Sequence, residues 1–140
     1  MYEKESKFFD VQLSSLSDPI NLFEWLSINS GGFPEPYTFG KRLKKILSND
    51  IDKYDILHDN QSLCYELLDF QKQKPLVTTI HHPISKDLNY QLQSTNDIFL
   101  KLLMRRWHSF LTMQKFVAKK LNKILVPSKS SIVDIREEFG

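Results

Sequence analysis

Residues 75–83 read Pro75-Leu-Val-Thr-Thr-Ile-His-His-Pro83, and this stretch decides the fold class. Leu76 to Ile80 is a short apolar run rich in β-branched residues, which is typical of a buried strand in a parallel sheet. Two histidines follow at the predicted carboxyl end of the strand, and Pro83 fixes the direction in which the chain leaves it. In an open parallel sheet, ligands bind beyond the carboxyl ends of the strands, so this edge is the first place to look for chemistry.

The segments around this strand alternate between short apolar runs and longer helical patterns. The expected strands are Asp52–Leu57, Leu76–Ile80 and Ile124–Val126, and the expected helices are Leu63–Phe70, a long helix from about Asp97 to Leu121, and one after Ser128. A polar loop is expected between Pro83 and Asn96, and most of the long helix's apolar face is expected to be core. This order predicts a Rossmann-like α/β fold, with a parallel sheet, flanking helices and right-handed crossovers.

The N-terminal third carries weaker signals. Phe8–Leu13 is compatible with a strand, and Asp18-Pro19 is a helix start, with Asp as the cap and Pro in the first turn. A helix is expected over Ile20–Ile28, followed by a loop at Ser30–Pro36 because glycines and prolines are dense there. Tyr37–Leu47 then predicts a helix with a basic face.

Composition bounds the function class. The chain has 140 residues, of which 41% are hydrophobic and 26% charged, so we expect a single globular domain over residues 1–140. Its 19 basic and 17 acidic residues give a net charge of +2, which argues against a nucleic-acid partner. The single cysteine and the absence of a signal-peptide pattern favour the cytoplasm.

Polar groups follow all three predicted strands. They are His58-Asp59-Asn60-Gln61, His81-His82 and Ser128-Lys-Ser-Ser131. The topology gathers them along one edge, where a neutral imidazole at His81 could bond a sugar hydroxyl or a phosphate. For each group alone, a strand-end turn or a helix cap is the more common use, and it is their joint occurrence that favours a site.

Other kinds of chemistry have little support. His58, His81 and His82 with Asp59 could supply metal ligands, but their spacing lacks a helical pair typical of metal sites. Cys64 lies within a helical pattern, where a small buried thiol is the common case. No hydrolase, dinucleotide or phosphate-loop motif is present.

The polar side of the expected long helix is basic. It carries Arg105, Arg106, Lys115, Lys119, Lys120 and Lys123. Such a side could contact an anionic membrane surface, although a solvated basic face is the more frequent explanation. Without an inserted apolar face, we expect at most weak, salt-sensitive peripheral contact at the inner face of the membrane.

Four blocks together resemble a known family, most clearly over residues 33–140. They are Tyr54-Asp-Ile-Leu-His-Asp-Asn-Gln-Ser-Leu63, Pro75-Leu-Val-Thr-Thr-Ile-His-His-Pro83, Arg105-Arg-Trp-His-Ser-Phe-Leu-Thr-Met-Gln114 and Val126-Pro-Ser-Lys-Ser-Ser-Ile-Val-Asp-Ile135, with Phe33-Pro-Glu-Pro-Tyr-Thr-Phe39 ahead of them. This ordered set is similar to the N-terminal domain of subfamily-4-like GT-B glycosyltransferases. The resemblance implies a domain that shapes the acceptor side of a cleft, while a C-terminal domain holds most of a nucleotide-sugar.

The resemblance also implies roles for individual residues. His81 would be the catalytic residue that faces the transferring sugar or the acceptor. The residues expected to line the same cleft and bind substrate are His58, Asp59, Asn60, Gln61, His82 and Ser128. Family members use no obligatory metal, so the nucleotide-sugar would be a co-substrate and no cofactor is expected.

Two departures from the family pattern shape the remaining expectations. The family opens with a strand and a glycine-rich loop, which this chain lacks, and the chain stops at Gly140 before a donor-binding domain. We therefore expect a partial glycosyltransferase domain that is inactive alone and, with a gap in its sheet, a poor monomer. The alternative is a non-catalytic α/β binding or interaction module.

Overall fold

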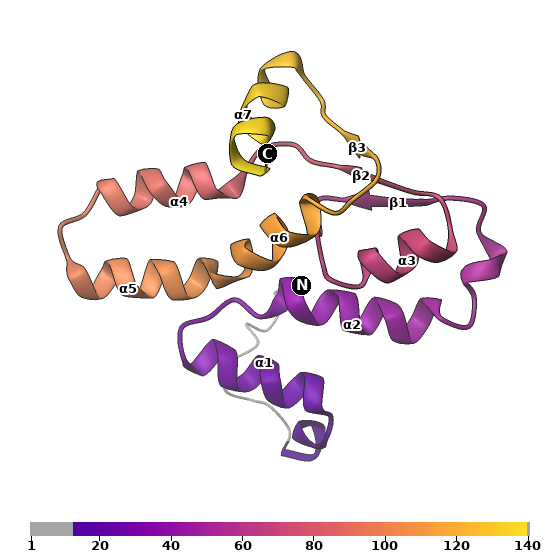
Figure 1. Cartoon of the computed structure of the whole chain (residues 1–140). Helices are drawn as coiled ribbons and strands as arrows, with labels where there is room; N and C mark the ends of the chain where they lie inside the picture. The colour runs from indigo at the N-terminus through magenta and orange to yellow at the C-terminus, as the bar shows by residue number, and fades with distance from the viewer. Residues whose placement is uncertain (1–12, 140) are drawn as a thin grey trace, which may run out of the picture.

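A computed structural model describes residues 13–139 of the chain (Figure 1). Its centre is a parallel sheet of β1 (Leu57–Asn60), β2 (Leu76–Thr79) and β3 (Ile124–Leu125), in the spatial order β1-β2-β3. The predicted parallel α/β architecture is confirmed, and each strand is followed by at least one helix.

Seven α-helices lie within the described residues. They are α1 (Pro19–Asn29), α2 (Glu35–Leu47), α3 (Leu67–Gln73), α4 (Ile84–Gln93), α5 (Ile98–Trp107), α6 (Leu111–Ala118) and α7 (Lys129–Phe139), with 3-10 turns at Leu13–Ser17, Ile51–Lys53 and His108–Phe110. In Figure 1, α2, α3 and α6 lie on one side of the sheet, and α1 lies beneath α2 on the side away from it. None of the helices in residues 13–139 has the length and apolar character needed to cross a bilayer.

The first helix begins as its sequence predicts. The Asp18 carboxylate accepts a hydrogen bond from the backbone N–H of Ile20 at 2.7 Å, and Pro19 occupies the first helical position. This bond, followed by the ion pair with Lys45, holds the pKa of Asp18 below its usual value. The carboxylate therefore satisfies a donor that the first turn leaves unpaired.

The core packs against one face of the sheet. Residues of β2 alternate along the strand, with Leu76 and Thr78 buried and Val77 and Thr79 half-buried. A parallel sheet is usually covered on both faces, and the β-branched run predicts full burial of this strand. That part of the prediction is wrong, because the described helices α2, α3 and α6 cover only the face that carries Leu76.

The region between β2 and β3 differs most from expectation. The polar loop expected before Asn96 contains α4, and the expected long helix is two helices, α5 and α6, separated by the His108–Phe110 turn. Phe33 stacks on Trp107 at 5.0 Å and meets Phe110 edge-on at 5.7 Å, so both sides of the break pack on one ring. Figure 1 shows α4 and α5 running side by side away from the sheet, and we call residues 84–107 the α4–α5 arm.

The apolar face of the expected long helix is therefore buried in its second half and exposed in its first half. Phe110, Met113 and Val117 are buried as predicted. On the arm the prediction of core is wrong, since Phe99 is 70% exposed and Trp107 is 48% exposed. The hydrophobic pattern was helical throughout, but only the second half of it reaches the core.

Three further expectations need correction or lie out of reach. Ile51–Lys53 is a 3-10 turn and the strand begins at Leu57, so the expected Asp52–Leu57 strand starts too early. The expected gap in the sheet is wrong for the described strands, because β2 bonds to β1 on one side and β3 on the other. Residues 8–12 of the expected first strand lie outside the described residues.

Candidate functional site

The carboxyl ends of β1 and β2 meet at one edge of the sheet. Asn60 is the register partner of Thr79, so the residues that follow each strand leave from the same place. Directly after β1 the chain turns through Gln61, with φ of 60°, and Leu63, with φ of 50°. Non-glycine residues rarely adopt this left-handed region, and such outliers cluster at functional sites.

His81 is exposed at this edge and contacts Asn60, the last residue of β1, and Gln61, the residue after it. Its Nε2 lies 2.8 Å from Asn60 Oδ1, and its backbone N–H donates to Gln61 Oε1 at 2.7 Å. The structure therefore brings His81 to Asn60 and Gln61, although it is 20 or more positions from both in the sequence.

The main chain of His82 also bonds Gln61, but its side chain points toward α4. Gln61 Nε2 donates to the His82 carbonyl at 2.9 Å. The His82 ring is exposed, with Nε2 3.3 Å from Asp87 Oδ2 on α4. The main chain of His82 thus belongs to the edge, while its imidazole contacts the base of the arm.

His58 lies on the less covered face of the sheet. Its Nε2 is 2.8 Å from the hydroxyl of Thr79, the last residue of β2. This places an exposed imidazole two residues before Asn60, on the same face of β1 and near the same edge. The sequence analysis did not identify Thr79 as a partner of His58. In the parallel pairing, Thr79 lies two residues beyond Val77, which is the register partner of His58.

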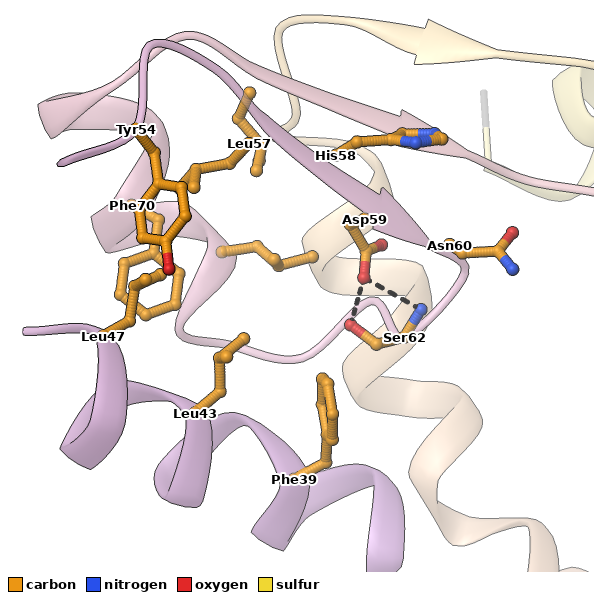
Figure 2. A pocket seen from close by; sticks show the side chains of 12 residues that line it. Phe39, Leu43, Leu47, Tyr54, Leu57, His58, Asp59, Asn60, Ser62 and Phe70 are labelled. Carbon is orange, nitrogen blue, oxygen red and sulfur yellow. Dashed lines mark hydrogen bonds between the residues drawn. The ribbon is translucent and has the colours of Figure 1, made fainter. Parts of the chain in front are cut away.

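Asp59 points to the opposite side of β1 and is buried. Figure 2 shows its carboxylate turned toward Ser62, with Oδ1 accepting from the Ser62 hydroxyl and, at 3.2 Å, from the Ser62 backbone N–H. These bonds close the turn after β1. Its Oδ2 is buried without a hydrogen-bond partner in the described part of the chain.

The side of β1 that carries Asp59 faces an apolar groove. Its volume is about 350 Å³, and its walls include Phe39, Leu43 and Leu47 of α2 (Figure 2). β1 pairs only with β2 among the described strands, so the groove runs along an unpaired strand edge. The groove is lined mostly by hydrocarbon and differs in character from the polar edge at His81.

Ser128 opens the helix that follows β3. Its hydroxyl accepts from the Ser131 backbone N–H at 3.1 Å and lies 2.9 and 2.8 Å from the hydroxyls of Ser130 and Ser131. The structure therefore shows the capping contact that its sequence position allows. A contact between Ser128 and substrate stays a prediction.

Cys64 is fully buried as predicted, but it lies before α3 and not within the helix expected from Leu63, because α3 begins at Leu67. Burial raises the pKa of its thiol, which outweighs the opposing hydrogen bond from Ser62. A protonated, buried thiol is a poor nucleophile. Within residues 13–139, no group of three or more His, Cys, Asp or Glu side chains is placed to hold a metal ion.

The sequence matches a known family along nearly its whole length. The pattern of Glycosyltransferase Family 4 covers residues 8–140. The chain belongs to this family. It is also 36% identical, over 141 residues, to an MMP alpha-(1->4)-mannosyltransferase from Mycolicibacterium hassiacum.

The alignment with that relative spans all of this chain but only part of the relative. It covers 100% of this chain and 34% of the mannosyltransferase. The chain thus corresponds to about a third of a family enzyme, and its Rossmann-like α/β sheet is that of a glycosyltransferase domain.

Proposed function

We propose that this chain forms the acceptor-side domain of a glycosyltransferase that transfers a hexosyl group from a nucleotide-sugar to an acceptor. In this reaction the acceptor oxygen bonds to the anomeric carbon, the bond from that carbon to the phosphate oxygen breaks, and the acceptor proton is released. The nucleotide-sugar is a co-substrate, and the proposal includes no resident metal or cofactor. The name of the relative supports a mannosyl group as the first to test.

The observation that carries the proposal is the exposed His81 at the carboxyl edge of the parallel sheet. Ligands of open α/β sheets bind at that edge, and His81 is held there by Asn60 and Gln61. His81 is the proposed catalytic residue. The proposed substrate-contacting residues beside it are His58, Asn60, Gln61 and His82, and Ser128 is proposed to contact substrate from the end of β3. The predicted substrate contact of Asp59 does not fit this edge, because its carboxylate is buried on the other side of β1 and bonds Ser62.

Family membership and coverage define what the chain contributes. Because it spans 34% of the relative, we propose that donor binding requires a second domain and that the 140 residues do not transfer sugar alone. Transfer by the purified chain from any nucleotide-sugar would contradict this part. The proposed location is the cytoplasm.

Replacement of His81 tests the proposed chemistry. In an active protein that joins this domain to a donor-binding domain, His81→Ala is expected to lower turnover by roughly 10²-fold or more, because transition-state hydrogen bonds are lost. Lys41→Ala is the control, since Lys41 is exposed on α2. Unchanged kinetics of a folded His81→Ala protein would reject the catalytic role and favour the interaction-module alternative.

We also propose weak peripheral contact with anionic membranes. Arg105, Lys119 and Lys123 are exposed, whereas Arg106 bonds Ser30 Oγ at 2.8 Å, so the basic residues do not form one continuous face. Binding should therefore be weak, because salt at 0.1 M screens the attraction between these charges and the lipid beyond about 10 Å. Sedimentation with anionic vesicles should fall at high salt, and equal binding to neutral vesicles would contradict the proposal.

A further inference from the structure

The side chain of Gln61 binds the main chain on both sides of the His81–His82 peptide. Its Oε1 accepts from the His81 N–H at 2.7 Å, and its Nε2 donates to the His82 carbonyl at 2.9 Å. A carboxamide offers one acceptor and one donor, as a backbone peptide unit does. Because β1 ends at Asn60, this side chain continues the pairing between the strands beyond the end of the ladder.

The backbone angle of Gln61 shows that turn geometry alone does not explain a glutamine at this position. Its φ is 60°, a region that glycine adopts with far less steric conflict than glutamine does. A glycine would make the turn more easily but would lack the carboxamide. The strained glutamine therefore coincides with the two hydrogen bonds that fix the chain at His81.

Asn60 fixes the imidazole ring of the same histidine. Its Oδ1 lies 2.8 Å from His81 Nε2. A carboxamide oxygen only accepts hydrogen bonds, so this contact is a hydrogen bond when Nε2 carries the proton, and in a neutral ring Nδ1 is then an unprotonated acceptor. Within residues 13–139, Nδ1 has no hydrogen-bond partner, and the His81 side chain is exposed.

We propose that Asn60 and Gln61 are positioning residues for His81, and that together they present its Nδ1 as an acceptor for a substrate hydroxyl. This inference rests on the proposed function and refines the roles of Asn60 and Gln61 within it. An acceptor nitrogen pairs with a hydroxyl hydrogen, whereas an ionised phosphate has only acceptor oxygens. The ligand group that faces neutral His81 is therefore a sugar hydroxyl rather than the donor phosphate.

Hydrogen exchange in the 140-residue chain tests the positioning directly, without any activity. Gln61→Gly suits the backbone angle and removes the carboxamide, so we expect exchange of the His81 amide to accelerate about tenfold or more. Gln61→Glu retains the acceptor oxygen and should keep the protection. Thr79→Val removes the partner of His58 instead and should leave the His81 amide protected.

Long-range ¹H–¹⁵N correlation of the histidine rings at pH 8 tests the proton position. We expect His81 to carry its proton on Nε2, and we expect Asn60→Ala to weaken the one-bond Nε2–H signal by faster exchange with water. A proton on Nδ1, or an Nε2–H signal unaffected by Asn60→Ala, would overturn the ring assignment. Equal exchange of the His81 amide in wild type and Gln61→Gly would overturn the main-chain assignment.

Kinetics in an active protein with a donor-binding domain test whether the positioning serves the reaction. Gln61→Gly should lower kcat about tenfold with little change in KM, and Gln61→Glu should recover part of the loss. If His81→Ala impairs transfer and Gln61→Gly does not, this inference fails alone. If His81→Ala has no effect, the proposed function fails, whatever the exchange experiments show.

Discussion

Gly40 lies where α2 packs tightly against the segment before α3. A Cβ built there would lie 2.0 Å from Glu66 Oε2 and 2.8 Å from both Cβ and Sγ of Cys64. Cys64 is fully buried in the core and cannot withdraw into solvent. The hydrogen atom of this glycine is thus what allows the two segments to touch.

We predict that Gly40→Ala destabilises the chain by about 1–3 kcal/mol, as overpacking of a core does. In an unobstructed helix the same change would stabilise by up to about 1 kcal/mol, so the sign is diagnostic. Urea unfolding measures the difference. Lys41→Ala, at the exposed neighbouring position, should change stability by at most about 0.5 kcal/mol, and a stabilised Gly40→Ala would contradict the close approach.

At the scale of residues, the part of the site that could be predicted from the sequence is the part that the order of the strands determines. The carboxyl ends of parallel neighbours meet, and this alone placed His81 beside Asn60 and Gln61. Two features could not be read from residue type. The first is the left-handed turn at Gln61, because no glycine in the sequence marks it. The second is the burial of Asp59, because the start of β1 was predicted too early to show which side of the strand Asp59 occupies.

At the scale of elements, α1 is attached to α2 by a polar cluster. Both Glu24 oxygens accept from the Arg42 guanidinium, which also donates to Asn21 Oδ1 at 2.9 Å, and Glu24 accepts from the buried Thr38 hydroxyl. The hydrogen bond from Arg42 is the main cause that lowers the pKa of Glu24 below its ordinary 4.5, against the opposing effect of burial.

This cluster predicts a pH-dependent contribution to stability. A carboxylate whose pKa is lower in the folded state stabilises the fold above its unfolded pKa, and that stabilisation is lost as the pH falls through the folded value. Glu24→Gln should therefore cost roughly 1 kcal/mol at pH 7 and progressively less below about pH 4.5. Thermal unfolding at several pH values measures it.

An exposed carboxylate in another part of the chain provides the control for this experiment. Asp55 is exposed before β1, so Asp55→Asn should show little pH-dependent difference. A Glu24→Gln deficit that stays constant from pH 7 to pH 3 would contradict the charged pairing and indicate a packing effect instead.

The elements themselves were predicted unevenly, for physical reasons. Pro19 after a capping aspartate and the apolar run after Pro75 predicted a helix and a strand that the structure confirms. Within the arm, the helical character of α5 was predicted, whereas a polar loop was expected where α4 lies, and many of the apolar side chains of α5 are exposed. Hydrophobic spacing predicts that a segment is helical, but it cannot tell whether the apolar side meets the core.

At the scale of the whole molecule, exposed apolar side chains are concentrated outside the core. On α5, Ile98 and Phe99 are 76% and 70% exposed, and on α1, Leu26 is 53% exposed. Apolar surface of this kind favours association in water. The unpaired edge of β1 among the described strands adds to the same tendency.

We predict concentration-dependent self-association of the isolated chain, driven largely by the arm. Phe99→Glu should shift the population toward monomer without lowering the unfolding temperature, because the side chain is exposed. Sedimentation velocity over a concentration series measures this. Asn96→Glu adds the same charge at an exposed polar position and should have a smaller effect, and a wild-type chain that stays monomeric throughout would contradict the prediction.

The direct pairing of β2 with β3 has a consequence for the order of folding. Thr79 and Leu125 are register partners, although the whole arm and α6 lie between them in the chain. Closing so long a loop costs chain entropy before any ladder bond forms, whereas the β1–β2 crossover closes over a much shorter stretch. We therefore expect the β1–α3–β2 unit to form early and the two-residue strand β3 to join last. Since closure entropy grows only with the logarithm of loop length, lengthening the tip of the arm should slow that final step very little.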